Sequence, residues 1–271
     1  MNKEEDSVVK QDQDSANVSM NDAPPPRRRP GIYLLPNLFT TAGLFAGFYG
    51  IVAAIGGRYE EAAIAIFVAI VMDGMDGRIA RMTNTQSDFG AEYDSLVDMV
   101  AFGLAPALIV YEWALQPLGK IGWLIAFVYV AATALRLARF NTQASALGKR
   151  YFQGLASPAA AGLIAGLVWF VDDAGMTGAE VAYIAAFLTL AAGVLMVSNV
   201  RYRSFKDIDF KGKIRFVIVL FIVLGLVFIS IAPPQVLFLL ALIYAGSGPL
   251  LTLMSLRKKR LARQVADSDK G

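Results

Sequence analysis

The sequence contains no cysteine and no histidine among its 271 residues. The absence of both residue types excludes disulfides, thiol nucleophiles, Cys/His zinc sites, haem ligation by histidine and Ser-His-Asp triads. Charged residues are also scarce, at 17% against 56% hydrophobic residues, which leaves too little polar surface to cover a soluble globule. These proportions predict an integral membrane protein, and a net charge of +3 gives no sign of a nucleic-acid partner.

Long apolar segments follow a polar amino-terminal region. Residues 1–30 are mixed in charge and lack the apolar core of a signal peptide, so we expect a disordered cytoplasmic tail. The rest is predicted to be an all-α, polytopic membrane domain over 31–256, followed by a basic cytoplasmic tail over 257–271, because the apolar segments are about 20 residues long without two-residue alternation. The eight expected spans lie near residues 37–56, 62–82, 89–113, 118–138, 155–172, 179–199, 214–232 and 235–256.

The distribution of basic residues tests this count independently of hydropathy. With the amino terminus inside, 23 of the 25 lysines and arginines fall on the inner side, and only Arg58 and Lys120 fall on the outer side. One missed span would move whole clusters across the bilayer. The distribution therefore predicts that both termini are cytoplasmic.

Four aspartates lie where the second predicted span ends and the third begins. Asp73 and Asp76 are spaced i, i+3, and Asp94 and Asp98 are spaced i, i+4, so each pair occupies one helical face. Both spans reach the roughly 20 residues that a bilayer requires only by including these aspartates. An antiparallel hairpin that turns near residue 85 would bring the four carboxylates to one depth in the cytoplasmic half of the membrane.

Four unpaired anions at that depth would cost roughly 2.5–3.5 kcal/mol each. Hard divalent cations with oxygen ligands compensate such a cluster without histidine or cysteine. The alternative is that these aspartates are helix caps or ion-pair partners. Gly77, Arg81 and Gly90 lie on or beside the same faces and together describe a pocket for a metal-bound phosphate. Taken one at a time, Gly77 and Gly90 also fit close helix packing. Arg81 also fits the general excess of basic residues on the inner side.

Residues 73–98 follow the pattern D-x2-D-G-x2-A-R-x8-G-x3-D-x3-D, which resembles the signature of the CDP-alcohol phosphotransferase family. The resemblance implies a core of six helices and an enzyme that moves a phosphatidyl or related group from a CDP-linked donor to an alcohol hydroxyl, with release of CMP. It also implies that the carboxylates bind two divalent cations, Mg²⁺ or Mn²⁺, and that one of them is also the catalytic base. The implied metal ligands are Asp73, Asp76, Asp94 and Asp98, with Asp98 as the base.

The same resemblance implies a binding region for CDP-diacylglycerol. Gly77, Arg81, Ser87 and Gly90 fall where the family holds the cytidine diphosphate. Asn37 and Thr40, in the run Pro36-Asn37-Leu-Phe-Thr40, resemble a weaker motif near the nucleotide, and their alternative role is to cap the first helix.

Two further stretches resemble the membrane phosphatidylserine synthases of this family. They are A-L-R-L-A-R-F-N over 134–141 and F-Q-G-L-A-S-P-A-A-A over 152–161, in which Ala156 replaces an expected proline. The resemblance implies L-serine as the acceptor, a prokaryotic cytoplasmic membrane, a site open to the cytoplasm and a homodimer. Residues proposed to bind serine are Arg136 and Arg139 for its carboxylate, and Asn141 or Ser157 for its amine or hydroxyl.

Alternatives stay open at this point. The two arginines also fit contacts with lipid phosphates, and the glycine pairs Gly43/Gly47 and Gly162/Gly166 fit either helix packing or a dimer surface. Within the family, the acceptor could instead be that of a phosphatidylglycerophosphate synthase or another alcohol. A divalent-cation transporter is a remote alternative, because the apolar run over 99–111 offers no polar path to the outer side.

Overall fold

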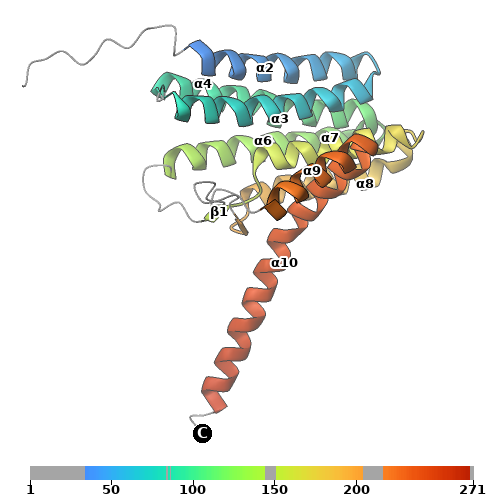
Figure 1. Ribbon diagram of the computed structural model, residues 1–271. Helices are drawn as coiled ribbons and strands as arrows, with labels where there is room; N and C mark the ends of the chain where they lie inside the picture. The colour runs from blue at the N-terminus through green and yellow to red at the C-terminus, as the bar shows by residue number, and fades with distance from the viewer. Residues whose placement is uncertain (1–33, 84, 86, 144–150, 204–215, 269–271) are drawn as a thin grey trace, which may run out of the picture.

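The computed structural model describes residues 34–83, 85, 87–143, 151–203 and 216–268 (Figure 1). The tail predicted over 1–30 lies outside these residues. Helices occupy all eight positions at which a span was predicted. They are α2 (Leu34–Ile55), α3 (Tyr59–Met82), an interrupted helical segment over 88–118, α6 (Lys120–Gln143), α7 (Ser157–Asp173), α8 (Ala182–Val197), α9 (Phe216–Ile231) and α10 (Pro233–Ser268).

Five of these stretches are long and apolar enough to cross a membrane by length and composition. The protein is therefore a multi-pass membrane protein, whereas the number of eight spans and the side on which the termini lie remain predictions. In Figure 1 the start of α2, the end of α3 and the end of α6 lie at the same end of the bundle. The five stretches cover 35–55, 88–118, 120–142, 178–197 and 233–252.

The two ends of the chain differ from the predicted boundaries. α2 begins at Leu34, three residues before the predicted start, because a proline such as Pro36 is tolerated in the first turn, where its missing N–H has no helical partner to lose. α10 continues as a helix to Ser268, beyond the predicted end at 256. It leaves the bundle as a long arm in Figure 1.

The segment over 88–118 is not one regular α-helix. Pro106 accounts for the first irregularity, because proline has no N–H and its ring clashes with the carbonyl four residues earlier, that of Phe102. The helix widens into a π-helical turn there. The successive pieces are α4 (Asp88–Asp98), the π-helix η2 (Met99–Leu104), α5 (Ala105–Val110), the π-helix η3 (Tyr111–Leu115) and the short 3₁₀-helix η4 (Gln116–Leu118).

The structure is helical, as predicted, except for one short ribbon. Strands β1 (Tyr151–Gln153) and β2 (Arg201–Arg203) form a two-stranded antiparallel ribbon in which Phe152 is opposite Tyr202. These segments connect α6 to α7 and α8 to α9, and the sequence analysis assigned no structure to them. Two connections that emerge at the same end of a bundle can pair their backbone groups with each other, which local patterns do not reveal.

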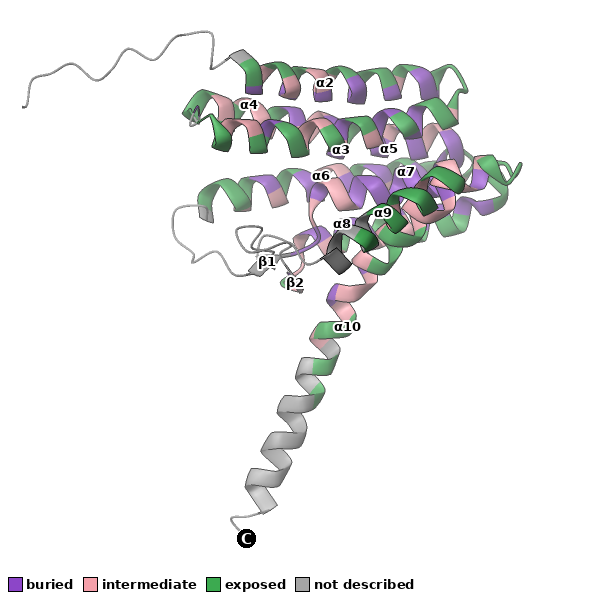
Figure 2. Ribbon diagram, in the orientation of Figure 1, coloured by how far each residue is buried: buried purple, intermediate pink, exposed green. Residues whose placement is uncertain are grey.

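Small residues bring the helices close together. A Cβ atom on Gly47 of α2 would lie 2.9 Å from the Cα of Ala101 in η2, and one on Gly166 of α7 would lie 3.0 Å from the Cα of Phe238 in α10. These glycines therefore pack helices within the chain and give no support to a dimer surface. The large apolar side chains of Phe45 and Phe48 on α2 are instead exposed. Figure 2 shows exposed residues along this helix.

Gly47→Ala should destabilise the protein, because the new methyl group would meet backbone atoms and force α2 away from η2. Overpacking of this kind costs about 1–3 kcal/mol. Gly225→Ala in α9 is the matched control, because a Cβ atom there meets nothing within 4 Å. The control should be neutral or slightly stabilising. Thermal unfolding followed by intrinsic tryptophan fluorescence in nanodiscs measures both, and equal melting temperatures would contradict the packing assignment.

Candidate active site

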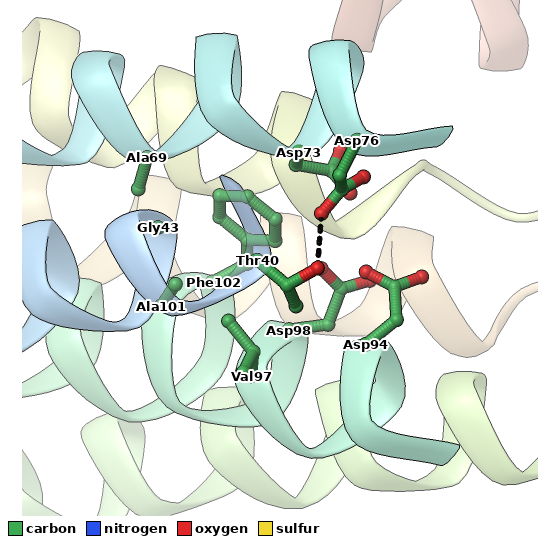
Figure 3. Close-up of a pocket in the computed structure, with 10 residues that line it drawn as sticks. All are labelled: Thr40, Gly43, Ala69, Asp73, Asp76, Asp94, Val97, Asp98, Ala101 and Phe102. Atoms are coloured by element: carbon green, nitrogen blue, oxygen red, sulfur yellow. Dashed lines mark hydrogen bonds between the residues drawn. The ribbon is translucent and has the colours of Figure 1, made fainter. Parts of the chain in front are cut away.

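A pocket of about 180 Å³ lies between α2, α3 and the α4–η2 segment. The structure brings all four predicted aspartates into its wall, two from α3 and two from α4 (Figure 3). This volume includes space open to solvent and is still far too small for a lipid-linked nucleotide. The pocket is lined by Thr40, Gly43, Ala69, Asp73, Asp76, Asp94, Val97, Asp98, Ala101 and Phe102.

Three of the carboxylates form a tight triplet. One carboxylate oxygen from each of Asp73, Asp76 and Asp94 lies within 4.8 Å of the others. Asp76 is only 5% exposed, and Asp98 lies beside the triplet in the same pocket. Among the residues that the structure describes, the only ion pair within 4 Å is Arg58 with Glu61, so none of the four carboxylates has such a partner.

The donor set fits hard divalent cations. Converging carboxylate oxygens, without nitrogen or sulfur ligands, are what Mg²⁺ and Mn²⁺ prefer. The half-buried setting of the triplet disfavours three uncompensated negative charges. Asp73, Asp76 and Asp94 are thus the residues placed to hold such ions, with Asp98 within the same cavity.

Thr40 of α2 contacts a carboxylate directly. Its hydroxyl lies 2.8 Å from Oδ2 of Asp76 and 3.1 Å from the carbonyl oxygen of Pro36, and it is 5% exposed (Figure 3). The hydroxyl donates to the carboxylate across two helices. A donor to a ligating carboxylate fixes its orientation, so Thr40 is placed to orient Asp76.

The other residues predicted to bind the nucleotide lie along the edge of α3 and α4. A Cβ atom on Gly77 would meet nothing within 4 Å, so a ligand has room to approach the backbone beside Asp76. Arg81 is exposed and donates from Nε to the Gly77 carbonyl at 2.8 Å. Ser87 caps α4, since its hydroxyl accepts from the Gly90 N–H at 3.0 Å.

Asn37 of α2 also reaches this edge. A Cβ atom on Gly90 would lie 3.6 Å from Oδ1 of Asn37 and 3.2 Å from Oγ of Ser87. The glycine therefore lets the start of α4 approach both polar side chains. These three residues gather at one place, although they come from two different helices.

The residues predicted to bind serine separate into two groups. Arg136 donates from Nη1 to Oγ of the fully buried Ser157 at 2.7 Å, and its charge lies close enough to interact with Asp98 and Asp73. Arg139 instead donates to the Val197 carbonyl at the end of α8, at 3.2 Å. Only Arg136 is thus brought towards the acidic pocket.

The structure also shows the hydrogen bond of Asn141 and the backbone conformation of Ala156. Nδ2 of Asn141 donates to Oγ of Ser95 at 3.0 Å, which ties the end of α6 to the residue after Asp94. Ala156 has φ −65° and ψ 137°, an extended conformation that the expected proline would share. The replacement of proline by alanine therefore leaves the backbone before Ser157 in the same geometry.

Tyr244 was missed by the sequence analysis. This α10 residue lies near Arg136, and its ring centroid lies 5.6 Å from that of Tyr202. Tyr202 donates its hydroxyl to the Ala245 carbonyl at 2.9 Å, which anchors α10 to β2, and burial raises the pKa of that hydroxyl to about 12. No local signal could have found this contact, because it joins elements more than 40 residues apart.

A multi-pass membrane bundle with an acidic pocket between α2, α3 and the α4–η2 segment defines the class of protein. Residues 33–197 match the CDP-alcohol phosphatidyltransferase family. The chain belongs to that family. The matched region contains the whole acidic pocket and ends before α9 and α10.

Individual relatives share much of this length. The CDP-diacylglycerol–serine O-phosphatidyltransferase of Helicobacter pylori strain 26695 is 39% identical over 200 residues, which cover 73% of this chain and 83% of the relative. The enzyme of the same name from Mycobacterium tuberculosis strain H37Rv is 34% identical over 182 residues, 65% of this chain and 63% of the relative. The archaetidylserine synthase of Methanothermobacter thermautotrophicus is 34% identical over 170 residues, 62% and 69% respectively.

Thr40→Val should weaken metal binding, because the isosteric side chain cannot donate to Asp76. The loss of such an orienting contact typically lowers metal affinity by about 10- to 100-fold. Thr41→Val is the control, since the Thr41 hydroxyl lies against Asn37 and Tyr93 and touches none of the aspartates. Electron paramagnetic resonance of free Mn²⁺ in a titration of the purified protein gives both affinities. Equal affinities in the two variants would remove Thr40 from this role.

Proposed function

We propose that this protein transfers the phosphatidyl group from CDP-diacylglycerol to the hydroxyl of L-serine, giving phosphatidylserine and CMP in phospholipid biosynthesis. The observation that carries the proposal is the acidic pocket, in which the Asp73, Asp76 and Asp94 oxygens lie within 4.8 Å of one another beside Asp98. Membership of the family supports the donor and the reaction type. The names of the relatives, which include an archaetidylserine synthase, support serine as the acceptor.

Two divalent cations, Mg²⁺ or Mn²⁺, are the proposed cofactors. Two such ions carry four positive charges, which balance the four carboxylates of the pocket. Asp73, Asp76 and Asp94 would hold them, with Thr40 orienting Asp76. When bound, the cations would neutralise the donor diphosphate and the leaving CMP.

The donor is proposed to lie along the open edge of the pocket, since the cavity itself is too small for it. The empty space beside Gly77 lets the diphosphate approach the carboxylates. Arg81 would turn from the Gly77 carbonyl to a phosphate oxygen, and Asn37, Ser87 and Gly90 would contact the nucleotide from the adjacent edge.

Asp98 is the proposed catalytic base. It shares the pocket but stands apart from the tight triplet, so one of its oxygens is available to an incoming hydroxyl. The serine oxygen forms a bond to the phosphorus of the phosphatidyl group, and the bond from that phosphorus to the bridging oxygen breaks. The bridging oxygen and its electron pair leave with CMP, and the hydroxyl proton passes to Asp98.

Arg136 is proposed to bind the serine carboxylate. It is the predicted acceptor residue whose charge reaches Asp98, and Ser157 holds its guanidinium in place from the start of α7. A guanidinium pairs with a carboxylate through two parallel hydrogen bonds. Asn141, tied to Ser95 beside Asp94, would orient the amine of serine, and Arg139 would support the end of α8.

The proposed setting is the cytoplasmic membrane of a prokaryote, with the pocket facing the cytoplasm. The excess of basic residues at the predicted inner ends of the helices supports this orientation. The domain over 31–256 would be the catalytic unit. A homodimer and contacts between the basic carboxyl-terminal residues and anionic lipid complete the proposal.

Asp98→Asn should lower kcat for CMP release by about 10²- to 10⁴-fold, because the amide cannot accept the serine proton. Its Mn²⁺ affinity should fall less than its kcat, because the triplet is intact. Asp76→Asn is the contrasting variant and should lose Mn²⁺ affinity. The assay uses CDP-diacylglycerol with L-serine, glycerol 3-phosphate, inositol, inositol phosphate or water as acceptor.

Turnover with serine alone supports the proposal as stated. Turnover with another acceptor would keep the metal site and reassign the pocket around Arg136. Full activity in Asp98→Asn would remove the base assignment. Silence with every acceptor, together with Mn²⁺ flux into proteoliposomes, would favour transport.

Arg136→Lys should raise the KM for serine by about 10- to 100-fold, because an ammonium cannot form the two parallel hydrogen bonds of a guanidinium. The KM for CDP-diacylglycerol should change little. Arg139→Lys is the matched control, since Arg139 bonds to the end of α8. Steady-state kinetics with both substrates varied separates these effects, and equal serine KM values for the two variants would contradict the assignment.

A further inference from the structure

The backbone turn after Asp98 contains a carbonyl that cannot accept from the residue four positions ahead. In a regular α-helix the carbonyl of Phe102 would accept from the N–H of residue 106, but Pro106 has none. The chain forms the π-helix η2 (Met99–Leu104) at this point. A backbone carbonyl without a donor is costly inside a membrane, where no water replaces the missing bond.

Tyr129 of α6 supplies a donor to this carbonyl. Its hydroxyl donates to the Phe102 carbonyl at 3.0 Å, and the whole residue is 0% exposed. The contact is reinforced one turn further along α6, where the Thr133 side chain packs on Gly103, so closely that a Cβ atom on the glycine would lie 3.1 Å from Cγ2 of the threonine. α6 is therefore fastened to η2 by a hydrogen bond and a close van der Waals contact.

The fastened turn belongs to the wall of the acidic pocket. Phe102 lies four residues after Asp98, on the same helical face, and both residues line the pocket (Figure 3). A shift of the Phe102 carbonyl would move the axis of the helix on which Asp98 stands. The position of Asp98 thus depends on a hydroxyl that contacts neither the carboxylates nor the pocket.

The same contact relates Asp98 to Arg136. Tyr129 and Arg136 are seven residues apart on α6, two turns along one face, and Arg136 lies near both Tyr129 and Asp98. A helix that is held to η2 at Tyr129 presents Arg136 at a defined distance from Asp98. The two groups that the proposed reaction assigns to the serine hydroxyl and carboxylate are therefore spaced by this bond.

We propose that Tyr129 is a positioning residue, whose hydroxyl holds the Phe102 carbonyl, to which Pro106 cannot donate, and so sets the spacing between Asp98 and Arg136. The proposal rests on the proposed function for the roles of Asp98 and Arg136. The structural part, that the hydroxyl stabilises the turn after Asp98, stands independently of it.

The test compares Tyr129→Phe with Tyr183→Phe, the same change at an α8 residue that is 82% exposed. We expect Tyr129→Phe to lower kcat for serine by about 10- to 100-fold, since small displacements of reacting groups have effects of this size, with the KM for CDP-diacylglycerol within twofold. In the metal-free protein, amide hydrogen exchange should rise over 99–107 and stay unchanged over 160–171. The control variant should match the unaltered protein in every measurement.

A second pair of variants tests the role of the carbonyl. Pro106→Ala restores a backbone N–H at position 106 and should make the Tyr129 hydroxyl dispensable. Pro106→Ala and Pro106→Ala/Tyr129→Phe should then share the same kcat and exchange pattern. This comparison remains decisive even if Tyr129→Phe alone does not fold.

Three results would overturn the inference. The first is a Tyr129→Phe variant with unchanged kcat and unchanged amide hydrogen exchange. The second is a Tyr129→Phe variant that loses thermal stability and nothing else. The third is a Pro106→Ala/Tyr129→Phe variant with a lower kcat than Pro106→Ala. If the unaltered protein releases no CMP with any acceptor, the proposed function fails, and the exchange measurements alone decide whether Tyr129 holds the turn.

Discussion

The placement of four carboxylates at one level of a membrane-embedded bundle is the constraint on which the rest of the structure depends. Like charges at this spacing repel strongly where the dielectric constant is low, and no described cation forms an ion pair with them. Holding the cluster therefore requires fixed helices and some compensation of its negative charge, which protons or divalent cations can supply. The converging carboxylates that repel one another are the same groups that are placed to hold divalent cations.

Each neighbouring helix contributes to holding that cluster. α2 donates from Thr40 to Asp76 and approaches η2 closely because Gly47 has no side chain. α6 reaches η2 through Tyr129 and brings Arg136 towards Asp98. The β1–β2 ribbon anchors α10, so that Tyr244 approaches Arg136 from outside the region shared with the family. The pocket is therefore defined by contacts between helices, while each helix alone carries only one part of it.

Much of this arrangement could be predicted from residue spacing. The i, i+3 and i, i+4 aspartate pairs and the turn near residue 85 predicted a shared pocket, and the structure lines one pocket with all four. Residue spacing did not predict the contacts that join residues far apart in the chain. Arg136 and Arg139 are indistinguishable as two basic residues one turn apart, yet one lies towards the pocket and the other bonds to the end of α8. The strand ribbon was missed for the same reason, because its two halves are about 50 residues apart.

The sequence by itself determined the membrane class, the helix positions, the acidic chemistry and the family, since hydropathy, charge and a spaced motif are properties of short stretches of chain. Tertiary structure decided which hydroxyl orients which carboxylate, which arginine reaches the site and how Pro106 is accommodated. Pro106 shows the difference well: the sequence reveals that one backbone carbonyl cannot accept from the residue four positions ahead, but only the packed bundle shows that Tyr129, from another helix, donates to it. Hydrogen bonds between helices depend on three-dimensional packing, which no local pattern encodes.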